Sequence, residues 1–378
     1  MRVVIAPDSF KECLTAMEAA TAIAEGIREI FPEAECRCLP MADGGEGTTE
    51  TLVSTRQGER IYEMVKGPMG EPVKAMFGLI DHGQTAVIEM AEASGLHLVP
   101  ANLRDPQISS TYGTGQLIKA ALERGARHII MGLGGSATND GGSGMLLALG
   151  ATMKDAKGND LSAGGLALSS LAELDLSGLD IRLNDTTIEV ACDVNNPLCG
   201  EQGASAIFGP QKGATPEMVQ TLDKALQNFG KMLAEQTGRD ALMTPGVGAA
   251  GGLGAALFAA LGASLTPGVD LVMKTINLRD AMVDADLVVT GEGRVDSQTI
   301  FGKTPYGVAQ AAKERNLPVV AVAGSVGQGF ESVYEHGIDI VLPIGRGPQT
   351  LNEALVEAKA NLTRTGRSIA SFWQLSRQ

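Results

Sequence analysis

The sequence has few aromatic residues, and fewer basic residues than acidic ones. Phe, Trp and Tyr make up 4% of the 378 residues, with a single Trp. Proteins that stack bases or sugars on aromatic platforms need more such side chains. Lys and Arg number 30 against 44 Asp and Glu, which gives a formal net charge of −14. Because so acidic a chain repels a phosphate backbone, we expect no nucleic acid partner.

Cysteine and histidine are too few, or wrongly spaced, for several classes of enzyme. The five cysteines are not spaced with histidines as zinc ligands are, and their odd number favours free thiols. The four histidines stand in no Ser-His-Asp pattern, and no Gly-x-Ser-x-Gly elbow follows a suitable strand. Serine hydrolases and zinc enzymes therefore lack their essential parts.

Long apolar segments are also missing. No apolar run approaches the roughly 18 residues that a membrane-spanning helix needs. The chain opens directly on the apolar run 2–6, without the basic and then apolar residues of a secretory leader. We therefore expect a cytoplasmic protein, a monomer or a homodimer, with no membrane partner.

Glycine, by contrast, is abundant. The 48 glycines exceed the average share of about 7%, yet Gly and Pro together stay below the level of low-complexity chains. With 44% hydrophobic residues, the chain can build a core. Its length favours two domains or one large α/β domain, because single cores stop growing beyond roughly 250–300 residues.

Apolar runs alternate with helical patterns along the chain. Several runs are apolar throughout, as buried parallel strands are. The predicted strands are 2–6, 35–39, 73–80, 85–90, 127–131, 188–192, 287–290, 319–323 and 338–342. Helix signals lie between them, such as the capping box of Thr15 and Glu18 and the Thr215-Pro216 start of a helix that ends at Gly238. This alternation predicts a doubly wound α/β architecture.

The spacing of the strands changes along the chain. The first two and the last three have the short spacing of one Rossmann-like parallel sheet, whereas the middle has no regular βαβ period. We therefore expect a discontinuous Rossmann-like domain, residues 1–63 and 268–378, with a mixed α/β domain, residues 64–267, inserted in it. The ligand site is expected in the cleft between the two.

The densest group of glycines follows the predicted strand 127–131 and precedes a predicted helix. Glycine lets backbone N–H groups converge on an anion, and the N-terminus of a following helix adds its positive end. At this density we favour phosphate binding over a merely tight turn. The predicted nucleotide-binding residues are Gly134, Gly135, Ser136, Ala137, Thr138 and Asn139. A second cluster, residues 246–262, fits either an anion loop or a close-packed helix, and we slightly favour packing.

Two named nucleotide motifs can be tested on these loops. The tail of a Walker A motif is present at Gly302-Lys303-Thr304, but its required first glycine would fall at Ser297. Gly132 to Ala137 does satisfy the dinucleotide fingerprint G-x-G-x-x-A, and Asp155 lies 18 residues beyond it. This keeps an NAD(P)-dependent dehydrogenase of a small hydroxy acid as the alternative, although the loop is polar and long for that motif.

Four further loops follow predicted strands and mix carboxylates with Gly, Asn, Lys or Arg. Their members are Asp8, Ser9 and Lys11; Asp43, Gly44 and Gly45; Asp193 and Asn195; and Arg294 and Asp296. One such aspartate is usually a helix cap, but four loops of this kind at the carboxyl ends of strands indicate a site. In phosphoryl transfer, carboxylates hold Mg²⁺ or accept a hydroxyl proton, while cations neutralise the transferring oxygens.

Six segments together resemble the bacterial glycerate kinase family, in order along the whole chain. They are 6–11 (APDSFK), 41–48 (MADGGEGT), 111–115 (TYGTG), 134–142 (GGSATNDGG), 191–198 (ACDVNNPL) and 290–296 (TGEGRVD). The resemblance implies the two-domain fold and transfer of a phosphoryl group from ATP, with Mg²⁺, to D-glycerate, giving 2-phosphoglycerate. The residues alone leave 3-phosphoglycerate open. One position departs from the family, because Gln116 stands where an acidic residue is expected.

For this reaction the residues suggest the following roles. Asp193 is the expected base for the attacking hydroxyl, and Asp296 and Asp8 are the expected Mg²⁺ ligands. Lys11 and Arg294 are expected to hold the substrate carboxylate or the γ-phosphoryl group. The substrate-binding set is Asp8, Ser9, Asp43, Gly44, Gly45 and Asn195. The acids could exchange roles, since a sequence gives no distances.

Overall fold

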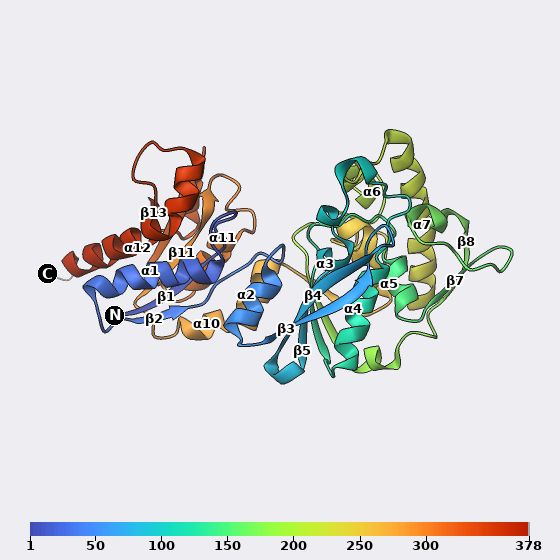
Figure 1. The fold of residues 1–378 in the computed structure, drawn as a ribbon, viewed down its shortest axis with the longest axis horizontal. Helices are drawn as coiled ribbons and strands as arrows, with labels where there is room; N and C mark the ends of the chain where they lie inside the picture. Colours follow the sequence, from blue (N-terminus) through green and yellow to red (C-terminus); the bar gives the residue numbers. More distant parts are fainter. Residues whose placement is uncertain (377–378) are drawn as a thin grey trace. The chain divides into compact units, whose positions relative to one another are not determined.

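The computed structural model describes residues 1–376, which form two compact α/β units (Figure 1). Unit 1 comprises Met1–Asp43 and Val269–Gln378, and unit 2 comprises Gly44–Gly268. Residues 44–63, expected in the first domain, lie in unit 2. The reason is that α2 (Thr48–Thr55) packs on β4 (Pro72–Ile80) of that unit, and that β3 (Glu59–Lys66) pairs along its whole length with the same strand.

Unit 1 is built on a five-stranded, fully parallel sheet in the order β13-β12-β11-β1-β2. The strands are β1 (Arg2–Pro7), β2 (Glu35–Cys38), β11 (Leu287–Val295), β12 (Val319–Val326) and β13 (Ile340–Pro343). All five were predicted, because strands buried on both faces are apolar throughout. The order is one of the two common doubly wound arrangements, and its switch point, where ligands bind in such sheets, lies between β1 and β11.

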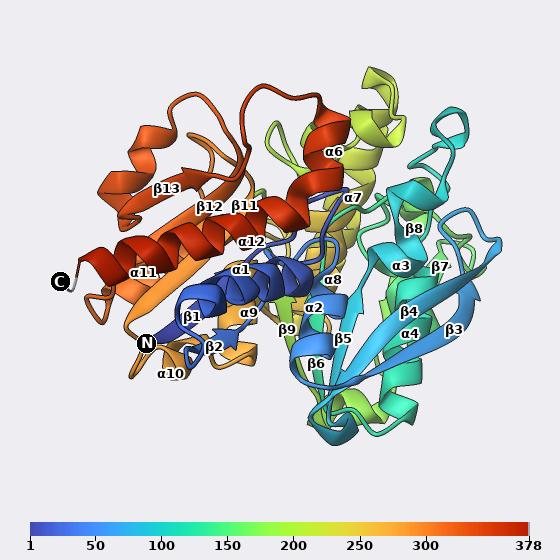
Figure 2. The ribbon, with the colours of Figure 1, turned by 60° about the vertical axis from the view of Figure 1, so that its left-hand side comes forward.

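Helices cover both faces of this sheet. α1 (Ala16–Ile30) and α12 (Leu351–Leu375) lie side by side on one face (Figure 2). Gly26 permits their contact, because a Cβ there would lie 1.8 Å from the carbonyl oxygen of Thr363. α11 (Thr304–Lys313) packs against β1, β11 and β12 on the opposite face. The remaining helices are α9 (Gly268–Thr275) and α10 (Leu278–Ala281).

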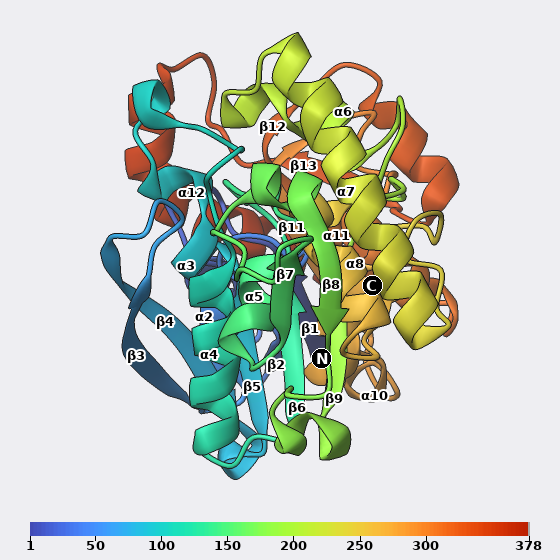
Figure 3. The ribbon, with the colours of Figure 1, turned by 90° about the vertical axis from the view of Figure 1, so that its right-hand side faces the viewer.

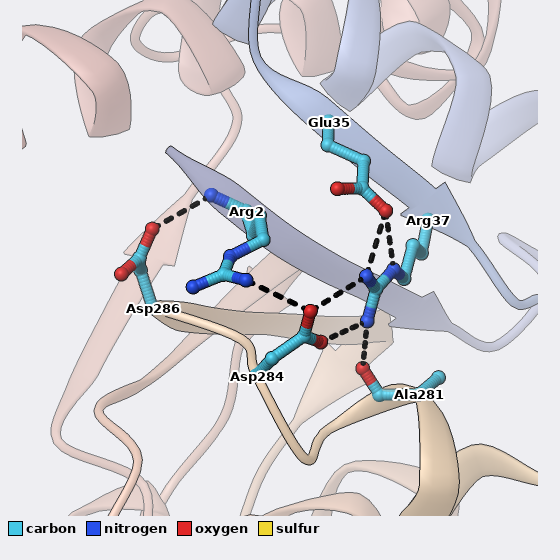
Figure 4. A network of polar contacts seen from close by, with 6 residues as sticks. All are labelled: Arg2, Glu35, Arg37, Ala281, Asp284 and Asp286. Carbon is cyan, nitrogen blue, oxygen red and sulfur yellow. Dashed lines mark hydrogen bonds and ion pairs between the residues drawn. The ribbon is translucent and has the colours of Figure 1, made fainter.

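Ion pairs connect β1, β2 and the segment before β11 at the amino-terminal edge of the sheet of unit 1 (Figure 4). Arg37 bonds to the Asp284 carboxylate and to Glu35, and its Nη1 donates to the carbonyl of Ala281 at 2.7 Å. Arg2 Nη1 reaches the same Asp284 at 2.9 Å. These partners hold the pKa of Asp284 below its usual range. The charges at this edge are paired with one another, so we assign it a structural role.

Unit 2 contains a six-stranded sheet in the order β10-β9-β6-β5-β4-β3. β3, β4 and β5 are antiparallel, and the strands from β5 to β10 are parallel. Besides β3 and β4, the strands are β5 (Thr85–Glu89), β6 (His128–Gly132), β9 (Thr187–Ala191) and β10 (Ser264–Thr266), and a separate ladder has β7 (Thr152–Asp155) and β8 (Leu171–Asp175). β3, β7, β8 and β10 are additional to the expected strands.

The core of unit 2 lies between one face of the sheet and a layer of helices (Figure 3). This layer holds α4 (Tyr112–Glu123), α5 (Ser143–Ala148), α7 (Pro216–Thr237) and α8 (Leu253–Ala259). α2 (Thr48–Thr55) packs on β4 and β5, where a Cβ at Gly78 would lie 2.3 Å from Val53. The short helices of the unit are α3 (Ala91–Ser94) and α6 (Ala204–Phe208).

Both helix starts predicted from the sequence are present. Thr15 caps α1 in a capping box with Glu18, and Thr215 caps α7, which ends at the left-handed Gly238. Short 3-10 helices are η1 (Asp81–Gly83), η2 (Leu96–Leu98), η3 (Ala101–Leu103), η4 (Gly165–Ser170), η5 (Ile181–Asp185), η6 (Pro210–Lys212), η7 (Ala249–Gly252) and η8 (Phe330–His336). Over residues 1–376, no helix combines the length and the apolar character needed to cross a membrane.

Candidate active site

In unit 2, four parallel strands finish in one row. Glu89, Gly132, Ala191 and Thr266 are register partners across β5, β6, β9 and β10. The glycine-rich loop after β6 and the Asp193 loop after β9 therefore start from the same edge. Open α/β sheets bind their ligands at this carboxyl edge.

Gly44 and Gly45 pack directly against this row. Gly44 has a φ of +87°, and a Cβ there would lie 2.5 Å from the Cβ of Ala191. A Cβ at Gly132 would lie 2.7 Å from the Gly44 carbonyl oxygen, and one at Gly134 would lie 3.3 Å from the Gly45 Cα. Two segments far apart in the sequence, both expected in the site, are therefore neighbours because their glycines let the backbones approach.

Glu89, at the end of β5, holds the first of these segments in place. Its carboxylate accepts the backbone N–H of Thr49 at 2.7 Å and that of Gly47 at 3.2 Å, at the start of α2. Burial raises the pKa of Glu89, and these two hydrogen bonds act in the opposite direction. Glu89 was not among the predicted site residues, because a strand-end glutamate has no motif of its own.

Only the start of the glycine-rich loop is exposed. Gly134 and Gly135 are exposed, whereas Ser136, Ala137, Thr138 and Asn139 are buried. The buried part is bound to the rest of the unit. The N–H of Ala137 donates to the carbonyl of Ser94 at 2.9 Å, and Asn139 Nδ2 donates to Ser205 Oγ at 2.8 Å. A ligand can therefore meet this loop mainly through the backbone of its two leading glycines.

The N-terminus of α5, which we expected to face a phosphate, is instead occupied by Asp140. This carboxylate accepts the N–H groups of Gly142 and Gly144 at 3.1 and 3.2 Å, and both the N–H and the hydroxyl of Thr111 at 2.8 and 2.9 Å. Burial raises the pKa of Asp140, while these hydrogen bonds lower it. The positive end of the helix thus stabilises a carboxylate of the protein itself.

A buried lysine lies beneath the loop. Lys212, in η6, is 1% exposed, and its Nζ donates to Ser136 Oγ at 2.8 Å and to the Thr138 carbonyl at 2.6 Å. Burial lowers the pKa of Lys212 to about 7, and the carboxylate of Asp140 acts in the opposite direction. A Pro-Gln-Lys turn gives no sequence signal for such a role.

The second glycine cluster packs behind the same loop. A Cβ at Gly251 would lie 2.0 Å from the Thr138 carbonyl oxygen, and one at Gly248 would lie 2.1 Å from the Pro197 carbonyl oxygen. Close packing, the slightly favoured of the two interpretations, is therefore what the structure shows for these glycines.

Asp193 lies in an exposed loop after β9. Its Oδ1 accepts the backbone N–H of Gly268 at 2.9 Å. Asn196 fixes this loop through Nδ2, which donates to the Gln202 carbonyl at 2.8 Å, whereas the side chain of Asn195 is exposed. Gln116, the departure from the family pattern, lies on α4.

In unit 1, Asp8 lies at the switch point between β1 and β11. Its N–H donates to the Gly291 carbonyl at 2.8 Å, and its carboxylate accepts the Thr304 hydroxyl and the Ser9 N–H, each at 2.6 Å. Burial raises the pKa of Asp8, and the Asp43 carboxylate raises it further against these hydrogen bonds. Asp8, Ser9 and Asp43 are therefore brought together, as expected.

β11 is longer than predicted, and this difference changes the site. β1 stops pairing where Pro7 meets Gly291, while β11 continues beside β12 as far as Val295. The expected loop after residue 290 is thus mostly strand. Because alternate residues of a strand share a face, Glu292 and Arg294 project on the same side.

Glu292 is a member of this site that we did not predict. Its Oε1 accepts the Thr299 hydroxyl at 2.8 Å, and Lys303 Nζ lies 3.6 Å from its Oε2. Burial raises the pKa of Glu292 to about 7, and the carboxylates of Asp8 and Asp296 contribute in the same direction. Glu292 lies between two glycines in the segment 290–296 that resembles the family. We did not select it, because we expected a loop there, and a loop would have left its side chain in solvent.

Three cationic side chains lie near these acids or along the same edge of the sheet. Arg294 Nε lies 3.0 Å from Asp296 Oδ2, and the arginine side chain is 65% exposed. Lys303 Nζ lies 3.9 Å from the other oxygen of Asp296. Lys11 is exposed, and its backbone N lies 3.9 Å from where a Cβ of Gly293 would be. Lys11 and Arg294 therefore both lie at the carboxyl edge of the sheet of unit 1.

The carboxylates of unit 1 fit a divalent cation. Burial raises the pKa of Asp8 and of Glu292, nearby carboxylates add to this rise in both, and a cation would relieve that part of the cost. Within the described chain, no three His, Cys, Asp or Glu side chains form a complete metal cluster. Mg²⁺ does not need one, because it typically takes one or two carboxylates and completes its shell with phosphate oxygens and water.

The chain is similar, over nearly its whole length, to a family of known kinases. The sequence model of the glycerate kinase family matches residues 3–374. The chain is 52% identical over 377 residues to the glycerate kinase of Bacillus subtilis (strain 168), covering 100% of this chain and 99% of the relative. It is 51% identical over 371 residues to the glycerate 2-kinase of Escherichia coli (strain K12), covering 98% and 97%. A crystal structure from Salmonella typhimurium LT2, provisionally named glycerate kinase 2, superposes with a TM-score of 0.93 at 51% identity, covering 100% and 99%.

Proposed function

Since the chain belongs to the glycerate kinase family, we propose that it transfers the γ-phosphoryl group of ATP to D-glycerate and forms 2-phosphoglycerate. The proposal rests on the match to kinases over the full length of a chain whose strand ends hold the parts that phosphoryl transfer needs. Transfer to O2 rather than O3 is supported by the relative named glycerate 2-kinase.

A dehydrogenase has less support. Its fingerprint needs an acidic side chain that binds the ribose of the dinucleotide. The candidate, Asp155, ends β7 and accepts the backbone N–H groups of Lys157 and Asn159 at 2.8 and 2.9 Å. This carboxylate therefore stabilises its own turn, which favours the kinase.

Gly134 and Gly135 are the proposed contact for the phosphates of ATP. They are the exposed part of the loop, and a glycine backbone lets phosphate oxygens approach N–H groups closely. Ser136, Ala137, Thr138 and Asn139 lie behind them, where their hydrogen bonds hold the loop in shape.

Asp8 and Asp296 are the proposed ligands of Mg²⁺, with Glu292 beside them. Burial and mutual repulsion make Asp8 and Glu292 costly to ionise without a cation. When bound, Mg²⁺ neutralises charge on the transferring phosphate oxygens. Lys11 and Arg294, both exposed, would add positive charge for the glycerate carboxylate or the γ-phosphoryl group.

Asp193 is the proposed base for the attacking hydroxyl. The hydrogen bond from Gly268 restricts the rotation of its carboxylate, as a group that must orient a hydroxyl requires. Ser9, Asp43, Gly44, Gly45 and Asn195 remain the proposed substrate contacts.

A coupled assay of ATP consumption tests the proposal. It compares D-glycerate, L-glycerate and hydroxypyruvate, with and without Mg²⁺. We expect turnover only with D-glycerate and Mg²⁺, and phosphorus NMR should show 2-phosphoglycerate as the product. Formation of 3-phosphoglycerate would overturn the position of transfer, and a change in nicotinamide absorbance without ATP would favour the dehydrogenase.

We place the reaction in the cytoplasm, where ATP is plentiful. The expected monomer or homodimer stays a prediction, and light scattering coupled to size-exclusion chromatography of the full chain measures it directly.

A further inference from the structure

The buried Lys212 has no role in the reaction as described so far. Its ammonium is fully enclosed, yet its hydrogen-bond partners are one hydroxyl and one carbonyl, of Ser136 and Thr138. Burying an ammonium is unfavourable unless the charge is compensated, and an apolar side chain of similar length usually packs as well or better. The Asp140 carboxylate favours the charged form of Lys212, but it is itself bonded to Thr111, Gly142 and Gly144.

The contact with Ser136 has a direction. When Lys212 is protonated, its ammonium can only donate hydrogen bonds, so Ser136 Oγ accepts from Lys212 Nζ. The hydroxyl proton of Ser136 is then left to donate elsewhere, and no acceptor for it is present in the part of the chain that the structure describes. Ser136 follows directly on the exposed Gly134 and Gly135.

Other polar atoms of the same loop are also unused. Thr138 Oγ1 and Asn139 Oδ1 are buried and have no hydrogen-bond partner among residues 1–376. A turn built only to join a strand to a helix would leave few such atoms, because each one is costly to bury. The loop therefore carries unsatisfied polar atoms in its buried part, directly after the exposed Gly134 and Gly135.

We propose that Lys212 is a positioning residue for the phosphates of the nucleotide: from beneath the loop it holds Ser136 and Thr138 and orients the Ser136 hydroxyl as a donor to a phosphate oxygen. This inference rests on the proposed function, because it assumes that the loop binds the phosphates of ATP. The charge of Lys212 also favours an anion bound to the loop, because the buried ammonium is screened less than a cation in water would be.

The test uses the full-length protein and two probes, ATP and inorganic tripolyphosphate, with binding measured by titration calorimetry. Lys212→Met removes the charge and keeps the length of the side chain. Lys212→Arg keeps the charge, Ser136→Ala removes the hydroxyl, and Lys157→Met removes an exposed lysine of the same unit as the matched control.

We expect Lys212→Met to weaken tripolyphosphate and ATP about tenfold or more, as loss of a charge-assisted phosphate contact does. Adenosine should bind as in the wild type, and the KM for D-glycerate at saturating ATP should not change. Lys212→Arg should restore part of the affinity, and Lys157→Met should have no effect. In the Ser136→Ala background, Lys212→Met should cost less than it does alone, because the two residues act through one contact.

Several results would overturn the inference. Wild-type affinity for tripolyphosphate in folded Lys212→Met is one, and an equal loss of adenosine binding, which indicates a purely structural role, is another. If Lys212→Met does not fold, Ser136→Ala decides, and unchanged tripolyphosphate affinity in that variant refutes the orienting role. Failure of the proposed function gives a different result, namely a wild-type protein that binds tripolyphosphate but does not phosphorylate D-glycerate.

Discussion

The carboxyl edges of the two sheets carry opposite chemistry. In unit 1 the edge gathers acidic and basic side chains, with Glu292 and Asp296 beside the cations Arg294 and Lys303. In unit 2 the edge is a backbone surface made by glycines. Among the described residues of this unit, the one buried cation is Lys212, and it donates to the inner side of the loop. Phosphoryl transfer needs both kinds of surface, since a metal requires carboxylates and phosphate oxygens require N–H donors.

The difference follows from how each edge is built. In unit 1, β11 continues beyond the end of β1. The last residues of β11 therefore have a neighbouring strand, β12, on one side only, and their polar side chains lie at this edge. In unit 2, the strand ends are in register, and neighbouring chain segments pack closely on them at glycines such as Gly44 and Gly132. A site rich in charge thus costs electrostatic energy, whereas a site rich in glycine costs conformational entropy.

The largest effect is expected at the one carboxylate of unit 2 that we assign to chemistry. Asp193→Asn keeps an oxygen that accepts the Gly268 N–H, so the fold should persist. If Asp193 deprotonates the hydroxyl, kcat should fall by about 10²–10⁴-fold, the contribution typical of a general base. Steady-state kinetics measure this loss.

The matched control is Asp240→Asn in the same unit. Asp240 also accepts backbone N–H groups, those of Leu242 and Met243 at 2.9 Å. It should leave kcat unchanged. Full turnover by Asp193→Asn would assign the base to another acid and would leave unit 2 with a binding role only.

The second prediction concerns metal affinity in unit 1. Asp296→Asn can still accept the N–H of Gln298, but it loses the charge that faces Arg294 and Lys303. The Mg²⁺ concentration at half-maximal rate should rise by at least about 10- to 100-fold, the loss that is typical even of residues that only orient a metal ligand. A Mg²⁺ titration of the initial rate shows this shift.

Asp339→Asn is its control, because Asp339 pairs with Lys313 just before β13, at the amino-terminal edge of the sheet. It should not change the Mg²⁺ dependence. An unchanged titration for Asp296→Asn would move the metal to other carboxylates and would weaken the division of labour between the two edges.

The third prediction tests how far unit 2 depends on missing side chains. Gly251→Ala adds a Cβ 2.0 Å from the Thr138 carbonyl oxygen at a φ of +67°. Overpacking and a left-handed backbone together should cost about 2–4 kcal/mol of unfolding free energy. Denaturant unfolding monitored by circular dichroism measures the cost, and ATP binding should weaken because Thr138 belongs to the loop.

Gly158→Ala separates the two causes. It also has a positive φ, +82°, but nothing lies within 4 Å of the added Cβ. Its cost should be about 1 kcal/mol, from backbone strain alone. Equal losses in the two variants would mean that close approach at Gly251 contributes nothing.

These features differ in how much of them could be read from the sequence. The five strands of unit 1 and the acid-bearing loops after β1 and β2 were predictable, because buried parallel strands and the residues after them have a local pattern. The edge strand β3 was missed because its charged and apolar residues follow no regular alternation, and because the expected domain boundary after residue 63 fell inside it. Its pairing with β4 places residues 44–63 in unit 2.

The rest depends on distant contacts. Glu292 matters because β11 extends past β1, which no local signal predicts. The role of Asp140 depends on Thr111, and that of Lys212 on Ser136, each far away in the sequence. A loop composition can therefore indicate phosphate chemistry, but it cannot say which of its atoms are already bonded inside the protein.

The smallest predicted effect concerns how much the ionisation of Glu292, at the edge of unit 1, destabilises the folded protein. Burial raises the pKa of Glu292 to about 7, above its value of 4.5 in the unfolded chain, so the folded state binds a proton more tightly than the unfolded state does. Without metal, the unfolding free energy should therefore fall as the pH rises from about 4.5 to 7, and stay lower above that range. Glu292→Gln removes this loss and should stabilise the metal-free protein at pH 8 by about 1–3 kcal/mol.

Thermal unfolding at two pH values measures this difference and supplies its own control. At pH 4, where Glu292 is protonated in both states, the wild type and Glu292→Gln should unfold at nearly the same temperature. At pH 8 the variant should be the more stable protein and the poorer enzyme, because it no longer offers a carboxylate beside the metal. A variant that is less stable at pH 8 would show that the charge of Glu292 is already compensated by Lys303, and the acidic edge would then carry no electrostatic cost.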